Sequence, residues 1–251
     1  MRIVAKMFLV IVIVTLLYPF IGPLSQRLAP EAQALGDYLQ VYGAIYGVLA
    51  AFIIFVVWGQ FTATETAIAK EVSNLEALAE MINFLDTRLE QEKAVCRRLI
   101  SHYATIVADD EFKSLAKAQE SHQAEATFST LLKEIQELRA RISSTQDQEI
   151  YLRILDIVSE AVRLRDDRVV ISKIRMPTTL WHLLQGVSYT LVASSALLPI
   201  QNQFLGYSLL LMITLVCSLL LAVITDLDNP FQGVWNISSE PLRVLAAKYR
   251  H

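Results

Sequence analysis

Four apolar stretches alternate with polar sequence along the chain, in two closely spaced pairs. The first pair covers residues 7–24 and 41–61, and the second covers residues 180–200 and 205–224. Each stretch is close to the ~20 residues that cross the hydrocarbon core of a bilayer as a helix. Because lipid offers the backbone no hydrogen-bond partner, we predict an all-α membrane protein with four transmembrane helices in two hairpins.

The segment between the pairs, residues 62–179, carries most of the charged residues. Residues 62–107 contain no Gly or Pro, and their apolar residues recur at steps of three and four, which indicates an amphipathic helix. These apolar positions are Ile68, Val72, Leu75, Ala79, Ile82, Leu85 and Leu89. Because no break separates them from the second apolar stretch, we predict one continuous helix that leaves the membrane and enters a cytoplasmic helical bundle.

Three signals predict where the later helices of this segment begin and end. Asp109 and Asp110 suit the start of the next helix, since acidic residues favour the positive end of the helix dipole. The pattern Thr145-x-x-Gln148 resembles a capping box for the helix after that. Pro177 predicts the end of the last cytoplasmic helix and the first turn of the third membrane helix.

The positions of Lys and Arg predict the orientation. They occur in both tails and in the middle segment, whereas Arg27 is the single one in the two short turns. By the positive-inside rule, both termini are cytoplasmic. The predicted organisation is an N-terminal transmembrane hairpin (1–61), a cytoplasmic helical domain (62–179), a C-terminal transmembrane hairpin (180–225) and a cytoplasmic tail (226–251). We expect a multi-pass protein of a bacterial inner membrane.

The sequence offers little for catalysis. None of the four His residues has a second ligand at helical spacing, and there is no Gly-rich phosphate loop or nucleophile motif. With a net charge of −3, the chain has no strongly basic segment for nucleic acid. Ionisable residues are absent from the centres of the apolar stretches, which disfavours a coupled transporter. We therefore expect no enzyme activity, no cofactor, no metal and no nucleic-acid partner.

The second apolar stretch is the best candidate for a pore wall. Ala44, Val48 and Phe52 are spaced four apart and therefore lie on one face of a helix. If several subunits placed this face around one axis, the result would be an apolar constriction that can gate by dewetting. The same spacing equally suits side chains that face lipid or a protein core, and the sequence leaves both interpretations open.

Two further helices show a preferred side. Gln185, Ser188 and Tyr189 give the third apolar stretch a polar side, which we expect to face other helices. In the tail, a short amphipathic helix is predicted to pack on the cytoplasmic bundle or on the membrane surface. Its apolar face comprises Leu242, Leu245, Ala246 and Tyr249.

The tail begins with acids, a turn and an aromatic residue, directly after the last apolar stretch. Asp226 and Asp228 are candidate contacts for a cation, and Asn229, Pro230 and Phe231 follow them. Two carboxylates are too few to specify a cation, because calcium takes six to eight oxygen ligands.

Taken with this arrangement, three segments resemble the bestrophin-like family, a domain of unknown function related to the bestrophin ion channels. They are the sequence VWGQF at 57–61, the stretch 165–181 with its basic residues and proline, and the tail 226–233. The resemblance extends over nearly the whole chain. It implies a homo-oligomer, a pentamer in the bestrophins, in which the second helix of each subunit lines one axial pore and the cytoplasmic helices extend that pore.

The resemblance also implies roles for individual residues. The neck of the pore, a set of apolar side chains one turn apart, falls by position on Val48 and Phe52, with Ala44 one turn further out. Animal bestrophins follow the last membrane helix with Asn-Pro-Phe and an acidic run that binds calcium. This chain has the Asn-Pro-Phe sequence but lacks the acidic run, so calcium gating does not carry over. The implied partners are the lipid membrane and permeant small ions, with chloride as one candidate.

Two other functions share this arrangement of helices. A stator-like or energy-coupling subunit also places two membrane pairs around a cytoplasmic helical insertion, and it works with a partner that bears a membrane carboxylate. A non-conducting scaffold would use the cytoplasmic helices as a docking platform. The tail sequence favours the channel over the stator-like subunit.

Overall fold

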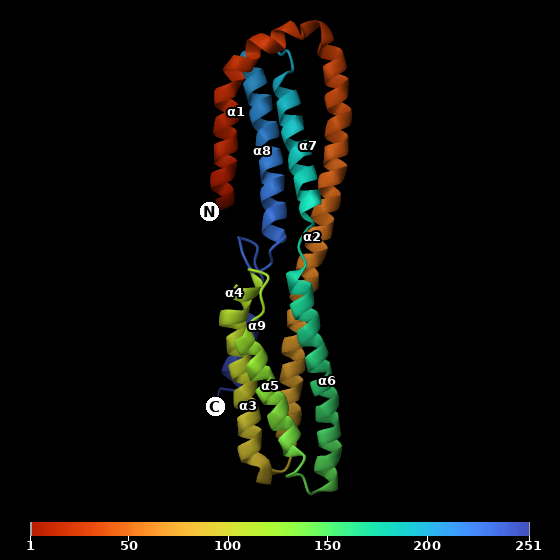
Figure 1. The fold of residues 1–251 in the computed structure, drawn as a ribbon, viewed down its shortest axis with the longest axis vertical. Coiled ribbons are helices and arrows are strands. Elements are labelled where there is room, and N and C mark those ends of the chain that lie inside the picture. The colour runs from red at the N-terminus through yellow and green to blue at the C-terminus, as the bar shows by residue number, and fades with distance from the viewer. Residues whose placement is uncertain (1, 251) are drawn as a thin grey trace. The chain divides into compact units, whose positions relative to one another are not determined.

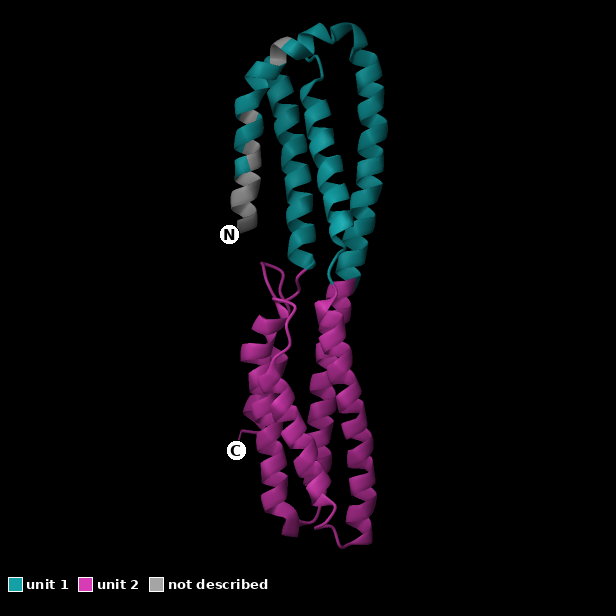
Figure 2. Cartoon of the chain, in the orientation of Figure 1, with its two compact units in different colours: residues 1–59, 175–228 teal, residues 60–174, 229–251 magenta. Residues whose placement is uncertain are grey.

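The computed structural model describes residues 2–250, and the side chains within this range except those of residues 2–8, 10, 11, 15, 22 and 23. The described residues form helices and connecting turns without a strand, which confirms the predicted all-α fold (Figure 1). The chain divides into two compact units (Figure 2). Unit 1 comprises Met1–Gly59 and Arg175–Asp228, and unit 2 comprises Gln60–Ile174 and Asn229–His251.

Unit 1 contains the apolar helices. They are α1 (Arg2–Arg27), the first part of α2 (Ala32–Asn83), α7 (Thr178–Ala196) and α8 (Gln203–Leu227), and a 3₁₀ turn, η1 (Ala29–Glu31), joins α1 to α2. Among the described residues, two helical segments are long and apolar enough to cross a membrane by length and composition. These segments are Ala29–Asn83 and Gln203–Leu227.

Helix α8 packs on both α1 and α7. At its contact with α1, the buried Tyr18 ring meets Tyr207 edge-on, with 4.4 Å between the ring centroids. A Cβ atom at Gly206 would overlap the hydroxyl of Tyr18, so this glycine permits the close approach of the two helices. Small residues serve the same purpose at the helix contacts of membrane proteins.

The turns of the two hairpins meet at one end of unit 1. The side-chain amide of Gln26, at the end of α1, donates a hydrogen bond of 3.5 Å to the carbonyl oxygen of Ile200, in the turn between α7 and α8. The two hairpins therefore open in the same direction.

Unit 2 is a helical bundle. It contains the second part of α2, η2 (Thr87–Leu89), α3 (Glu90–Ile106), the π-helix η3 (Val107–Glu111), α4 (Phe112–Leu115), α5 (His122–Leu138), α6 (Thr145–Lys173) and α9 (Glu240–Lys248). Helix α3 packs against α5 and α9.

The core of unit 2 confirms the predicted apolar stripe. Helix α2 runs unbroken for 52 residues, as the absence of a break after the second apolar stretch predicted, but it ends at Asn83. The segment 62–107, which lacks Gly and Pro, is therefore divided between α2, η2 and α3. Ile68, Leu75, Ala79, Ile82, Leu85 and Leu89 are buried in one cluster, and Val72 packs against it. The predicted face of the tail helix joins the same cluster, and Ser101 donates a 2.6 Å hydrogen bond to the carbonyl oxygen of Ala246. Of the two predicted partners for this helix, the structure shows the bundle.

The predicted helix start at Asp109 and Asp110 is wrong. Both residues lie in the π-helix, which continues α3 without a break, and the next helix after α4 begins at His122. Its N-cap is Ser121, whose hydroxyl accepts a hydrogen bond from the amide of Ala124. A π-helix holds one residue more per turn than the pattern of an α-helix assumes, and no Gly or Pro marks it in the sequence.

The predicted capping box at Thr145 is displaced by one residue. The N-cap of α6 is Ser144, whose hydroxyl accepts a 3.0 Å hydrogen bond from the amide of Asp147 and donates one of 2.7 Å to its carboxylate. The paired residue at the third helical position is therefore an aspartate rather than a glutamine. At its other end α6 stops at Lys173, and Pro177 stands at the N-cap of α7.

A network of charged side chains lies inside unit 2, where it joins four helical elements. Arg168 of α6 contacts Glu71 of α2 through Nε and Glu111 of η3 through Nη2, the latter at 2.8 Å. The hydroxyl of Tyr103 in α3 donates a 2.6 Å hydrogen bond to Glu71. All four residues are buried. Burial alone would lower the pKa of Arg168, but Glu71, Tyr103 and Glu111 outweigh it and raise that pKa well above its ordinary value.

Candidate pore-lining face and membrane-exit tail

One face of α2 within unit 1 is buried and the other is exposed. Tyr46, Ala50, Ile53 and Val57 follow each other at steps of three and four on the buried face. The hydroxyl of Tyr46 lies 3.2 Å from that of Ser188 on α7, which holds the two helices together across a polar contact. This contact also shows Ser188 facing another helix, as its position on the polar side of α7 predicted.

The exposed face of α2 carries the predicted neck residues. Val48 is 73% exposed and Phe52 is 60% exposed, and Ala44 is exposed one turn before them. Other exposed residues of the same stripe are Val41, Ile45 and Phe55. Large apolar side chains in such a row are unusual on a protein surface in contact with water, and they indicate contact with lipid or with other protein chains. Their role in a pore stays a prediction.

The wall that this face would form carries no charge. Residues 38–64, which include the whole exposed stripe, contain no Asp, Glu, Lys, Arg or His. A ring of this face around an axis would therefore control passage by width and by wetting rather than by charged side chains.

The tail residues are held by hydrogen bonds within the chain. Asp228, at the end of α8, accepts a 2.6 Å hydrogen bond from the amide of Met176 in unit 1. In unit 2, the side chain of Asn229 donates a 2.9 Å hydrogen bond to the carbonyl oxygen of Ala116. The Phe231 ring packs edge-on against Phe112, with 5.0 Å between the centroids.

The structure thus shows a structural use for most of the tail sequence. The carbonyl oxygen of Pro230 accepts a 2.8 Å hydrogen bond from the amide of Ile237, which closes the loop that begins at the end of α8. Among the described residues, no group of three or more His, Cys, Asp and Glu is placed to hold a metal ion. Cation contact by Asp226 and Asp228 stays a prediction.

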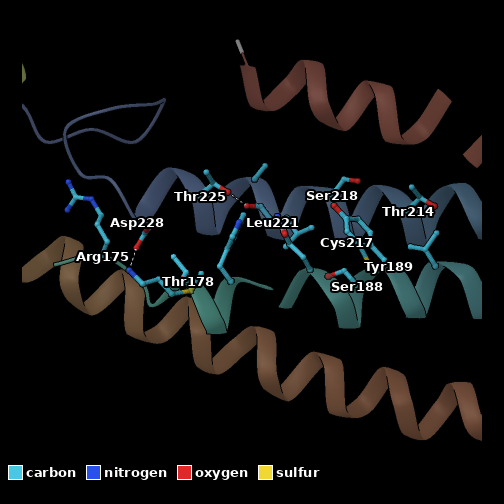
Figure 3. A pocket seen from close by; sticks show the side chains of 15 residues that line it. Arg175, Thr178, Ser188, Tyr189, Thr214, Cys217, Ser218, Leu221, Thr225 and Asp228 are labelled. Carbon is cyan, nitrogen blue, oxygen red and sulfur yellow. Dashed lines mark hydrogen bonds between the residues drawn. The ribbon is translucent and has the colours of Figure 1, made fainter. Parts of the chain in front are cut away.

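Unit 1 also holds a groove that the sequence did not predict. It lies between α7 and α8 and has a volume of about 500 Å³ (Figure 3). Arg175, Thr178, Thr225 and Asp228 line one end, and Ser188, Tyr189 and Thr214 line the other. The polar side predicted for α7 was a partial signal, since Gln185, Ser188 and Tyr189 all line this groove. The facing residues of α8 lie within an apolar sequence that gives no comparable signal.

The fold is shared with a bacterial bestrophin homologue from Klebsiella pneumoniae. One single-substitution variant of that homologue aligns with a TM-score of 0.71 and 12% identity, over 100% of this chain and 96% of that chain. A second variant aligns with a TM-score of 0.70 and 12% identity, over 96% of each chain. Identities this low show the fold alone. No curated protein matches the chain.

The family follows from the sequence itself. The model of the Bestrophin-like domain matches residues 7–242, which is nearly the whole chain. The chain therefore belongs to the Bestrophin-like family, and the resemblance seen in its sequence is confirmed.

Proposed function

We propose that this chain is the subunit of a homo-oligomeric ion channel in which α2 of each subunit lines one axial pore. The observation that carries the proposal is the exposed, uncharged stripe on α2, which includes Val48 and Phe52. A stripe of this kind is stable when other copies of the chain, or lipid, cover it. Membership of the Bestrophin-like family favours other copies, and the likeness to bestrophins favours a pentamer.

The proposed channel crosses the membrane with four helices. α2 and α8 satisfy the requirements of length and hydropathy. The meeting of the two hairpin turns at one end of unit 1 supports a crossing by α1 and α7 beside α2 and α8. The Lys and Arg residues of both tails and of unit 2 support a cytoplasmic position for these parts, in a bacterial inner membrane.

In this proposal the neck is an apolar gate. Val48 and Phe52 would face the axis and exclude water when the pore is narrow, since apolar constrictions close by dewetting. Small ions, with chloride as one candidate, are the permeant species. A wall without charged residues gives no preference for anions or for cations.

Ion flux from liposomes containing the purified protein tests the proposal. We expect the wild-type protein to conduct without a second subunit. Phe52→Ala should raise the flux several-fold, because the smaller side chain widens the neck and makes it easier to wet. Phe204→Ala is the matched control, since Phe204 is an aromatic residue of α8 that is 81% exposed and lies outside α2.

The outcomes separate the candidate functions. Equal flux in the wild type and in the Phe52 variant would contradict the neck, although the protein would still be a channel. Flux that appears only with a second subunit would support the stator-like function instead. A folded protein that conducts under none of these conditions would support the non-conducting scaffold.

A further inference from the structure

The groove between α7 and α8 is long and has two unlike ends. From Thr214 to Asp228 it follows α8 over 14 residue steps, or about 21 Å at 1.5 Å per step. Its volume of about 500 Å³ lies within the range of sites that bind organic molecules. Trp181, Val192 and Leu221 contribute apolar wall between the ends.

Three hydroxyl groups of the groove donate hydrogen bonds to their own helix. Ser188 donates to the carbonyl oxygen of Leu184, and Thr214 donates to that of Leu210, both at 2.7 Å. Thr225 makes the same bond to Leu221 at 2.7 Å. Side chains that return their hydrogen bonds to their own helix present mainly their carbon atoms to the groove. Around these three residues, and along the apolar wall, the groove therefore suits a hydrocarbon chain better than a polar solute.

The end of the groove at the last turn of α8 brings together charges of both signs. Arg175 and Asp228 are both half-buried, and the Arg175 side chain extends beyond the end of the groove (Figure 3). The amide of Met176 holds the Asp228 carboxylate in place. Burial lowers the pKa of Arg175, and the Asp228 charge opposes this effect. A guanidinium keeps its charge under such conditions, and it binds phosphate well.

We propose that this groove binds one acyl chain of a zwitterionic phospholipid, with its phosphate against Arg175 and its ammonium group against Asp228. The proposal relies on the membrane position proposed above for unit 1, but not on ion conduction. A purely anionic headgroup would meet the carboxylate of Asp228 unfavourably. A primary ammonium can donate hydrogen bonds to that carboxylate, whereas a quaternary one cannot, so phosphatidylethanolamine fits better than phosphatidylcholine.

Native mass spectrometry of the detergent-purified protein tests the site. The probes are phosphatidylethanolamine, phosphatidylcholine and phosphatidylglycerol with identical oleoyl chains. We expect the wild type to retain phosphatidylethanolamine about tenfold more strongly than the other two, as one charge-assisted hydrogen bond would provide. Asp228→Asn should move the preference towards phosphatidylglycerol, because the variant removes the negative charge and keeps an acceptor for Met176. Arg175→Gln should weaken the binding of all three.

Two variants of α8 test whether the acyl chain lies in the groove. Ala222→Phe places a bulky ring in the groove and should abolish retention of phosphatidylethanolamine. Leu219→Phe is the control, because Leu219 is exposed on α8 and does not line the groove, so retention should be unchanged. Far-UV circular dichroism verifies that both variants are folded.

Three results would overturn the proposal. They are equal retention of the three lipids by the wild type, undiminished retention by folded Ala222→Phe, and dissociation of an oligomer by Ala222→Phe in place of lipid loss. The last result would show that a second copy of the chain occupies the groove. None depends on ion flux, so failure of this site and failure of the channel are distinguished.

Discussion

Arg168 is the cation of the buried charge network in unit 2. Arg168→Met would leave the carboxylates of Glu71 and Glu111 buried without their cation. Removing one partner of a buried ion pair typically costs about 3–5 kcal/mol, because the remaining charge is not solvated. We expect a decrease of this size in the free energy of unfolding. Urea unfolding of the purified protein, followed by circular dichroism, measures it.

Arg163 is the matched control for Arg168 on the same helix. Its side chain is 60% exposed and pairs with Glu160 and Asp167 at the surface. Arg163→Met should change the free energy of unfolding by less than about 1 kcal/mol, as exposed ion pairs do. Similar losses from the two variants would show that burial of the network does not decide its contribution.

Only a weak signal for this network is present in the sequence. Residues 165–168 read Arg-Asp-Asp-Arg, a mixture of charges typical of a solvated helix face, and only the fold shows that Arg168 points inward. Glu71 was the better signal. It stands between Ile68 and Leu75 on the apolar stripe of α2, where a charge requires a buried partner. The identity of that partner depends on how the helices pack, which no local pattern contains.

At the scale of the helix, two neighbouring hydroxyl residues at the start of α6, Ser144 and Thr145, contribute differently to stability. Ser144→Ala removes the N-cap and its bonds to Asp147, so we expect a loss of about 1 kcal/mol in the free energy of unfolding. Thr145→Ala should stay within about 0.5 kcal/mol, because Thr145 is exposed in the first turn. Thermal or urea unfolding of both variants measures the difference. A larger loss for Thr145→Ala than for Ser144→Ala would show that Thr145 is the N-cap, as the sequence predicted.

Helices differ in how well their sequences define them. The unbroken course of α2 and its apolar stripe were predictable, since both depend on local composition and spacing. The π-helix at Val107–Glu111 was not, because its extra residue places Glu111 against Arg168 and the benefit comes from that contact. The groove between α7 and α8 could not be predicted from local sequence either, because two separate helices form it.

For the whole molecule, the sequence predicted the class of fold and the family, but not the assembly. Periodicity and the distribution of Lys and Arg are properties of one chain. A pore requires contacts between chains, and the exposure of the stripe with Val48 and Phe52 does not decide between lipid and a second chain as its cover. In the proposed channel, other copies of the chain cover this stripe. The number of copies follows neither from the sequence nor from this exposure and is measured by the mass of the purified protein.

The membrane topology is the remaining prediction at this scale. Single cysteines at Gln201 and Ser159, in a background without Cys96 and Cys217, can be labelled in intact cells with a membrane-impermeant maleimide. Gln201 lies in the turn between α7 and α8, and Ser159 is exposed on α6. We expect Gln201→Cys to react in intact cells and Ser159→Cys to react only after the membrane is opened, because the positive-inside rule predicts a cytoplasmic position for unit 2.

A third position tests whether α1 and α7 cross the membrane. Gln26 contacts Ile200, so a cysteine at Gln26 must react from the same side as one at Gln201 if both hairpins span the bilayer. If only α2 and α8 crossed, α1 would lie on the membrane surface and the shared contact between the two turns would be lost. Labelling of Gln26→Cys and Gln201→Cys from opposite sides would therefore contradict both the four-helix topology and the packing of unit 1. Labelling from one side would place the exposed stripe of α2 at the depth of the bilayer, where an apolar gate can act.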